Sequence, residues 1–251
     1  MSERTPYQPY GTAIYRREMN VHATDDGALG ELVDDFHHFR ARVKCDGDRV
    51  LEVVAESLRP PWSTCVEAER LLEHLEGMPL APSLRAAGQY TPSRMQCTHM
   101  FDAAALAIAR LGSGTGGVTY SIAIPDRVDG RTHATIERDG ELLLEWDLVK
   151  NEIVGSEPFS GQQIVGHQFA AWAEASLDRD RLEATLLLQR ACLISYGRDI
   201  DLESYARAID VPGGPMGACH TYQEGNLERA RRKVGSVRNL STVRGRLADQ
   251  S

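Results

Sequence analysis

Six short segments of the chain carry strand signals, and in several of them apolar residues alternate with polar ones, as in strands with one buried face. We predict these strands over residues 13–21, 33–45, 50–58, 117–124, 131–138 and 142–149. Asp46-Gly47 and Asp139-Gly140 separate neighbouring segments and are typical of hairpin turns. Each half of the chain therefore predicts an antiparallel meander with one buried face.

Both hairpins are expected to carry one residue more than a two-residue turn. Without it, apolar side chains on one strand would lie opposite charged side chains on the next. In the first hairpin the extra residue pairs Arg42 with Glu52 and His38 with Glu56 across the strands.

Helical spacing of apolar residues predicts helices over residues 62–75, 98–111, 162–175 and 181–196. The last helix is apolar on all sides, so we expect it to be deeply buried or to form the interface of a homo-oligomer. This order predicts an α+β fold: an antiparallel sheet from two strand meanders, helices packed on one face, and a C-terminal helical pair. The expected units are an α+β core over 1–155, a helical extension over 156–225 and a basic tail over 226–251.

The net charge of −8 combines an acidic body with a basic tail. Residues 226–251 hold seven basic and two acidic residues, a charge of +5, so the remainder carries −13. An acidic body of this size argues against a nucleic-acid partner. We therefore expect the tail to fold onto its own acidic body or onto a neighbouring subunit.

The chain shows no pattern of a membrane or secreted protein. Its longest apolar run, residues 103–109, is too short to cross a bilayer, and no basic-then-apolar signal opens the sequence. The odd number of five cysteines does not indicate a disulfide framework. We expect a cytoplasmic protein with no membrane partner.

Sequence motifs that bind nucleotides or activate a nucleophile are missing. The chain contains no phosphate-loop motif, no H-E-x-x-H, no G-x-S-x-G and no C-x-x-C pair. The glycine-rich residues 112–117 follow a predicted helix and precede a predicted strand, the reverse of a dinucleotide fingerprint. We therefore expect no organic cofactor.

The richest chemical cluster joins two helix starts. Cys97, His99 and Asp102 open the helix over 98–111, and Arg59, Trp62 and Cys65 precede or open the one before it. His99 and Asp102 are three residues apart and share a helix face, so the carboxylate could orient the imidazole for proton transfer. A helix N-terminus also lowers the pKa of a thiol.

Four interpretations of this cluster stay open. The residues could be structural, with buried thiols and satisfied helix ends. They could form a general acid/base site around His99 and Asp102. Cys97, His99 and Asp102, with Cys65, could hold a metal, although C-x-H-x-x-D is not a standard zinc spacing. A cysteine could act as a nucleophile.

Two further segments offer polar side chains. His220 and Tyr222 alternate in the segment Cys219-His220-Thr221-Tyr222, which is either a short edge strand or a source of an acid or a phenol-binding donor. His37 faces the apolar side of its strand and is a core residue or a further proton carrier.

Several of these residues follow a familiar order. The order consists of a hairpin with histidine in its first strand (36–42), Arg59 to Trp62, Cys65 with Ala68, Leu72 to Gly77 with Pro79, Gln96-Cys97-Thr98-His99 with Asp102, and the segment 219–222. It resembles the bacterial domain-of-unknown-function family 2889 from about residue 14 to residue 222, with the Cys-Thr-His motif as its most specific part. The resemblance implies a cytoplasmic bacterial protein, and some relatives are associated with breakdown of aromatic compounds, including lignin-derived dimers. The family is looser over 77–97 and often shorter at its C-terminus, so the helical pair over 162–196 is expected to be a specialisation.

These expectations combine into a small-molecule lyase that needs no organic cofactor. His99 held by Asp102, or His37, removes a proton from an alcohol of a hydroxylated aromatic compound, and a retro-aldol-like step releases an aldehyde such as formaldehyde. Trp62 stacks on the ring, Arg59 or Tyr222 holds the phenolate, and Cys97 and His220 complete the binding site. The alternatives are a decarboxylase, isomerase or hydratase, and a non-catalytic binding protein with structural cysteines and histidines.

Overall fold

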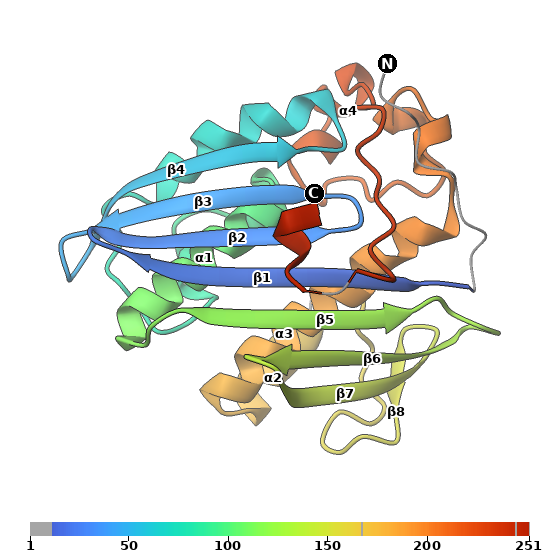
Figure 1. Ribbon diagram of the computed structural model, residues 1–251, viewed down its shortest axis with the longest axis horizontal. Coiled ribbons are helices and arrows are strands. Elements are labelled where there is room, and N and C mark those ends of the chain that lie inside the picture. The colour runs from blue at the N-terminus through green and yellow to red at the C-terminus, as the bar shows by residue number, and fades with distance from the viewer. Residues whose placement is uncertain (1–11, 167, 244, 251) are drawn as a thin grey trace.

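The centre of the fold is one antiparallel sheet of eight strands (Figure 1). The computed structural model describes residues 12–166, 168–243 and 245–250, so His167 and Arg244 of the expected helix and tail lie outside it. The strands are β1 (Ile14–Thr24), β2 (Gly27–Asp34), β3 (His38–Cys45), β4 (Val50–Arg59), β5 (Val118–Pro125), β6 (Arg131–Arg138), β7 (Glu141–Val149) and β8 (Glu152–Val154). Their order across the sheet is β4-β3-β2-β1-β5-β6-β7-β8.

The expected arrangement of two strand meanders is wrong. β1 pairs with β2 along one edge and with β5 along the other, so both halves of the chain belong to one continuous sheet. The expected strand over 33–45 is in fact the end of β2, a tight turn and β3. The turn contains neither glycine nor proline. The Asp34 carboxylate closes it by accepting the backbone N–H groups of Phe36 and His37.

The hairpin registers explain which cross-strand pairs form. In β6–β7, Ala134 lies opposite Trp146, and a register shift follows at Ile136, which confirms the expected extra residue. In β3–β4 the expected Arg42–Glu52 and His38–Glu56 pairs are wrong, because Lys44 lies opposite Glu52 and Arg40 opposite Glu56. The observed register differs from the expected one by two residues. A shift of two keeps every side chain on its face, so face patterns alone cannot detect it.

Helices cover one face of the sheet (Figure 1). The longer ones are the 3₁₀ helix η1 (Ser63–Leu75) and the α-helices α1 (Thr98–Ser113), α2 (Gln168–Ser176) and α3 (Arg179–Ile194). Short turns of helix are η2 (Ala86–Gln89), η3 (Ser93–Met95), η4 (Ser195–Asp199), η5 (Leu202–Ser204), η6 (Ala208–Asp210), η7 (His220–Tyr222), α4 (Asn226–Arg229) and η8 (Leu247–Gln250). Within the described residues, every helix is too short or too polar to span a bilayer.

A glycine in β2 sets the distance between α1 and the sheet. A Cβ atom on Gly30 would lie 2.2 Å from the carbonyl oxygen of Ala103, so only glycine permits this close approach. The contact places the first turn of α1 beside the turn that joins β2 to β3. In α3, the chain itself buries Leu186, Leu187 and Leu188. Deep burial in one chain therefore explains why this helix is apolar on all sides.

The C-terminal segment crosses the opposite face of the sheet, over β1, β2 and β3 (Figure 1). Leu240 and Leu247 pack against Val33, the backbone N–H of Leu247 donates to Glu18, and Arg246 pairs with Glu31. The expectation that helices cover only one face is therefore also wrong, since η8 lies on the other. The described part of the tail does fold onto its own acidic body, as its charge predicted.

Candidate functional site

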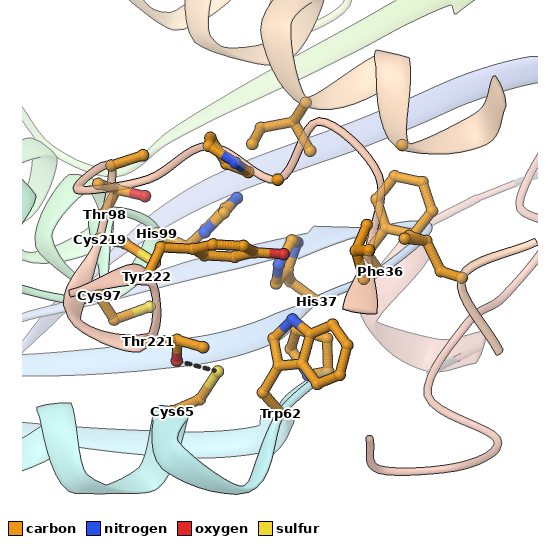
Figure 2. A pocket seen from close by; sticks show the side chains of 18 of the residues that line it. Phe36, His37, Trp62, Cys65, Cys97, Thr98, His99, Cys219, Thr221 and Tyr222 are labelled. Carbon is orange, nitrogen blue, oxygen red and sulfur yellow. Dashed lines mark hydrogen bonds between the residues drawn. The ribbon is translucent and has the colours of Figure 1, made fainter. Parts of the chain in front are cut away.

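A cavity of about 460 Å³ opens where five segments meet (Figure 2). It is lined by the β2–β3 turn, the starts of η1 and α1, the segment around η4, residues 211–222 and Arg232. Aromatic and aliphatic side chains, Phe36 and Trp62 among them, form most of its wall. A volume of this size suits a drug-sized aromatic ligand, since small-molecule sites fall at about 300–1,000 Å³.

Asp34 is a fully buried carboxylate that holds the cavity residue His37. Its Oδ2 accepts from the Tyr15 hydroxyl at 2.7 Å and from Arg17 Nη2 at 2.7 Å, and its Oδ1 lies 2.9 Å from His37 Nδ1. Burial acts to raise the pKa of Asp34, but its interactions with His37 and Arg17 outweigh burial and hold that pKa well below 3.8. The carboxylate is therefore ionised at neutral pH.

An ionised carboxylate can only accept a hydrogen bond, so it fixes the tautomer of His37. In the neutral ring the proton sits on Nδ1 and is donated to Asp34, which leaves Nε2 with its lone pair free. Burial lowers the pKa of His37 below 6.5 even though Asp34 acts to raise it. His37 lines the cavity, and its side chain keeps 12% of its surface exposed. It is a neutral base at physiological pH.

His99 stacks directly on His37. The ring centroids are 3.7 Å apart with an angle of 25° between the planes, and Figure 2 shows both rings on the cavity wall. The His99 ring makes no hydrogen bond within the described residues, and burial, then repulsion from the His37 ring when that ring is charged, holds its pKa well below 6.5. Because a charge on one ring disfavours a charge on the other, the stacked pair carries at most one positive charge.

Asp34, His37 and His99 bring one ligand atom each within 4.8 Å of one another, yet they do not fit a metal ion. Each oxygen of Asp34 already accepts three hydrogen bonds from protein donors. The lone pairs of two stacked imidazoles lie in nearly parallel planes and do not converge on one point.

The thiols of the predicted cluster are neutral. Burial raises the pKa of Cys65 to about 11 and that of Cys97 well above 9.0, so burial outweighs the expected effect of the helix N-terminus. Thiolates are the form that binds metals and attacks substrates. The structure therefore gives no support to a metal at Cys97 or to a cysteine nucleophile.

Asp102 does not hold His99. It forms an ion pair with Arg190 of α3 and lines a second cavity, between α1 and α3, that His99 does not reach. The shared helix face was a correct inference from the spacing, but a partner 88 positions away in the sequence takes the carboxylate. The carboxylate beside the imidazoles is Asp34.

Arg59 is also absent from the cavity wall. Its guanidinium donates to the backbone carbonyls of Asp34 at 2.6 Å, His37 at 2.9 Å and Ser236 at 2.6 Å. It therefore holds the turn that carries His37 and does not line the cavity. Its expected role as a substrate-binding residue is not supported.

The late segment does reach the cavity, although as the helical turn η7 rather than an edge strand. Trp62, Cys97, His220 and Tyr222 all line the cavity. Burial raises the pKa of the Tyr222 phenol to about 12, although the neighbouring Trp62 indole acts to lower it. Figure 2 shows the hydroxyl directed toward the side of the cavity that holds His37 and Trp62. Tyr222 is thus a neutral phenol that can donate a hydrogen bond.

Sequence reasoning missed Asp34 and Arg232. Asp34 lies in the run Val-Asp-Asp-Phe-His-His, where two adjacent acids before two histidines were the available signal. Arg232 was counted within the basic tail, and only the fold brings it against Trp62, where its guanidinium carbon lies 3.6 Å from the ring centroid.

The chain has no match among models of known families, and no curated protein matches it. The resemblance to family 2889 therefore remains a prediction from the Cys-Thr-His segment and its neighbours.

Proposed function

We propose that the protein is a lyase that acts on a small hydroxylated aromatic compound by general acid/base catalysis, without an organic cofactor. One observation carries the proposal: His37 is a neutral imidazole, held by a buried carboxylate at Nδ1, with Nε2 free at an apolar cavity. A positioned base of lowered pKa in a cavity is the arrangement that proton-transfer enzymes use.

The reaction that fits is a retro-aldol cleavage of a hydroxymethyl group. Nε2 of His37 takes the proton of the alcohol, the oxygen electrons form the carbonyl bond, and the carbon–carbon bond breaks. Its electron pair passes to the ring-bearing carbon, which must be conjugated with an electron-accepting group. That carbon then takes up a proton, so a substrate R–CH₂OH gives R–H and formaldehyde with no change in oxidation state.

The other cavity groups have roles that follow from their charge states. Tyr222 stays protonated and can donate a hydrogen bond to the oxygen on which charge develops. The second neutral imidazole, His99, can accept a hydrogen bond from the substrate hydroxyl or relay the hydroxyl proton to His37. Asp34 acts through His37 and is a positioning residue. Phe36 and Trp62 offer aromatic surface to the ring.

The test is product release from hydroxymethyl-bearing phenolic compounds, including lignin-derived dimers. Aldehyde and carbon dioxide are both measured for the wild type, His37→Gln and a control, His74→Gln, whose side chain is exposed on η1. We expect aldehyde from the wild type and the control, and a loss of about 100-fold or more in His37→Gln.

Other outcomes assign other functions. Carbon dioxide in place of aldehyde indicates a decarboxylase that uses the same base. Binding of the aromatic compounds without any product indicates a non-catalytic binding protein. Equal turnover in His37→Gln and His74→Gln rules out His37 as the base.

A further inference from the structure

Arg232 is a buried cation in the wall of the cavity. Its side chain is 8% exposed, and its guanidinium lies over the Trp62 ring at 3.6 Å from the centroid. The backbone fixes this position, since Lys233 donates to the carbonyl of Pro61 at 3.0 Å and Arg232 to that of Ala206 at 3.0 Å. The side chain is therefore held at the Trp62 end of the site.

The guanidinium leaves most of its hydrogen-bonding capacity unused. Nη1 donates one long bond of 3.4 Å to the carbonyl of Pro61, whereas Nε and Nη2 are buried and have no partner among the described residues. Glu203 is the carboxylate whose charge acts most strongly on Arg232, but its oxygens accept the backbone N–H groups of Gly235 and Val237. No carboxylate in the described part of the chain lies within 4.0 Å of Arg232.

The unused atoms form one particular edge. Nε and Nη2 point the same way and together bind a carboxylate. At least three other arginines of the described chain use that edge. Arg17 presents Nε at 3.1 Å and Nη2 at 2.7 Å to Asp34, and Arg198 and Arg207 present the same pair to both oxygens of Asp126 and Asp210. Buried N–H groups without acceptors are costly, so a ligand that supplies two anionic oxygens is favoured here. Its binding requires the Arg232 side chain to rotate, because neither nitrogen is exposed at the cavity wall.

We propose that Arg232 binds a carboxylate of the ligand, so that the cavity takes an aromatic monocarboxylic acid. One guanidinium edge balances one negative charge, and the rest of the wall is mostly apolar, which disfavours a dianion such as a phosphate ester. The inference rests on the proposed function only in treating this cavity as the substrate site. The reaction is a separate matter, because Arg232 recognises a part of the ligand that does not react.

The experiment compares two ligands that differ only at one ring substituent, vanillate with a carboxylate and vanillyl alcohol with a neutral hydroxymethyl group, and uses benzoate and 4-hydroxybenzoate as further acids. Binding is measured by calorimetry to the wild type, Arg232→Gln, Arg232→Lys and Arg231→Gln, the last being an exposed neighbour of the same charge. We expect the wild type and Arg231→Gln to prefer the acid by roughly 10- to 100-fold. Arg232→Gln should lose that preference and keep its affinity for the alcohol, and Arg232→Lys should keep part of it.

Three outcomes overturn the inference: equal affinity of the wild type for acid and alcohol, an unchanged preference in Arg232→Gln, or no saturable binding of any of the three acids. If Arg232→Gln does not fold, the ligand pair on the wild type and Arg232→Lys still decide the matter. These binding results do not depend on turnover. Loss of turnover in His37→Gln with no acid preference would refute the carboxylate site alone, whereas acid preference with full turnover in His37→Gln would refute the proposed base alone.

Discussion

Replacing Asp34 with asparagine removes the charge on which both the turn and the base depend. The substitution leaves the Arg17 guanidinium, 1% exposed, without its ionic partner, and it places an amide among groups that all donate. Breaking a buried ion pair by removing one partner costs about 3–5 kcal/mol. For a chain of this size that corresponds to a fall in Tm of roughly 6–20 °C.

A matched control is available on the surface. Asp26 forms an ion pair with Arg42 at 2.8 Å, but both side chains are more than 40% exposed. Exposed pairs of this kind contribute about 0–1 kcal/mol, so Asp26→Asn should change Tm by a few degrees at most. Urea denaturation followed by circular dichroism measures both variants. If Asp34→Asn costs no more than Asp26→Asn, the buried network does not hold the site as described.

The same substitution also separates positioning from stability. Asp34→Asn no longer enforces a proton on Nδ1 of His37, so it should lower kcat well beyond the loss expected from the unfolded fraction. Asp34→Asn should also change the pH profile of kcat/KM, whereas replacing a purely structural residue would not change that profile.

Three further predictions concern pH and packing. Burial raises the pKa of Asp35 from 3.8 to about 7, so the stability that its protonated form contributes is fully present below about pH 4 and lost as the pH rises through 7. Denaturation at a series of pH values should therefore show the wild type losing stability over this range relative to Asp35→Asn, and parallel curves would contradict this. Because the pKa of His37 is lowered, kcat/KM should stay constant above pH 6.5 and fall only below it. A fall in kcat/KM that already begins above pH 6.5 would contradict His37 as the base. Gly30→Ala, whose Cβ would lie 2.2 Å from the Ala103 oxygen, should lower Tm and turnover together, whereas Gly88→Ala has open space and should change neither.

Regular elements with a clear period could be predicted from the sequence. The alternation in β6 and the bulged register of β6–β7 follow directly from matching two apolar faces. The helix α1 follows from its alanine-rich apolar run. These elements depend on local patterns, which a single sequence contains in full.

The β2–β3 turn could not be found in that way. Its signal is neither glycine nor proline but the Asp34 side chain, which satisfies two backbone N–H groups. Regular alternation of apolar and charged residues begins only at Phe39, and residues 33–38 contain no glycine or proline that would separate them from it, so the pattern predicts one strand over 33–45. The pairing of β1 with β5, which joins the two halves into one sheet, spans about 100 residues and has no local signature.

The site was predicted in part. The Cys-Thr-His segment, Trp62 and Tyr222 do meet at one cavity, because the spacing put them at element ends. The partner of the imidazole was wrong, since the choice between Asp34 and Asp102 is made by tertiary contacts with Arg17 and Arg190. Spacing along one helix cannot contain that information.

The most direct test of the account is the protonation state of His37 in the folded protein. Nitrogen-15 NMR of the imidazoles, with the His37 signals assigned by their loss in His37→Gln, reports both tautomer and charge. We expect a neutral ring with the proton on Nδ1 at pH 7, becoming charged only below pH 6.5. A ring that is charged at pH 7, or neutral with its proton on Nε2, would contradict it.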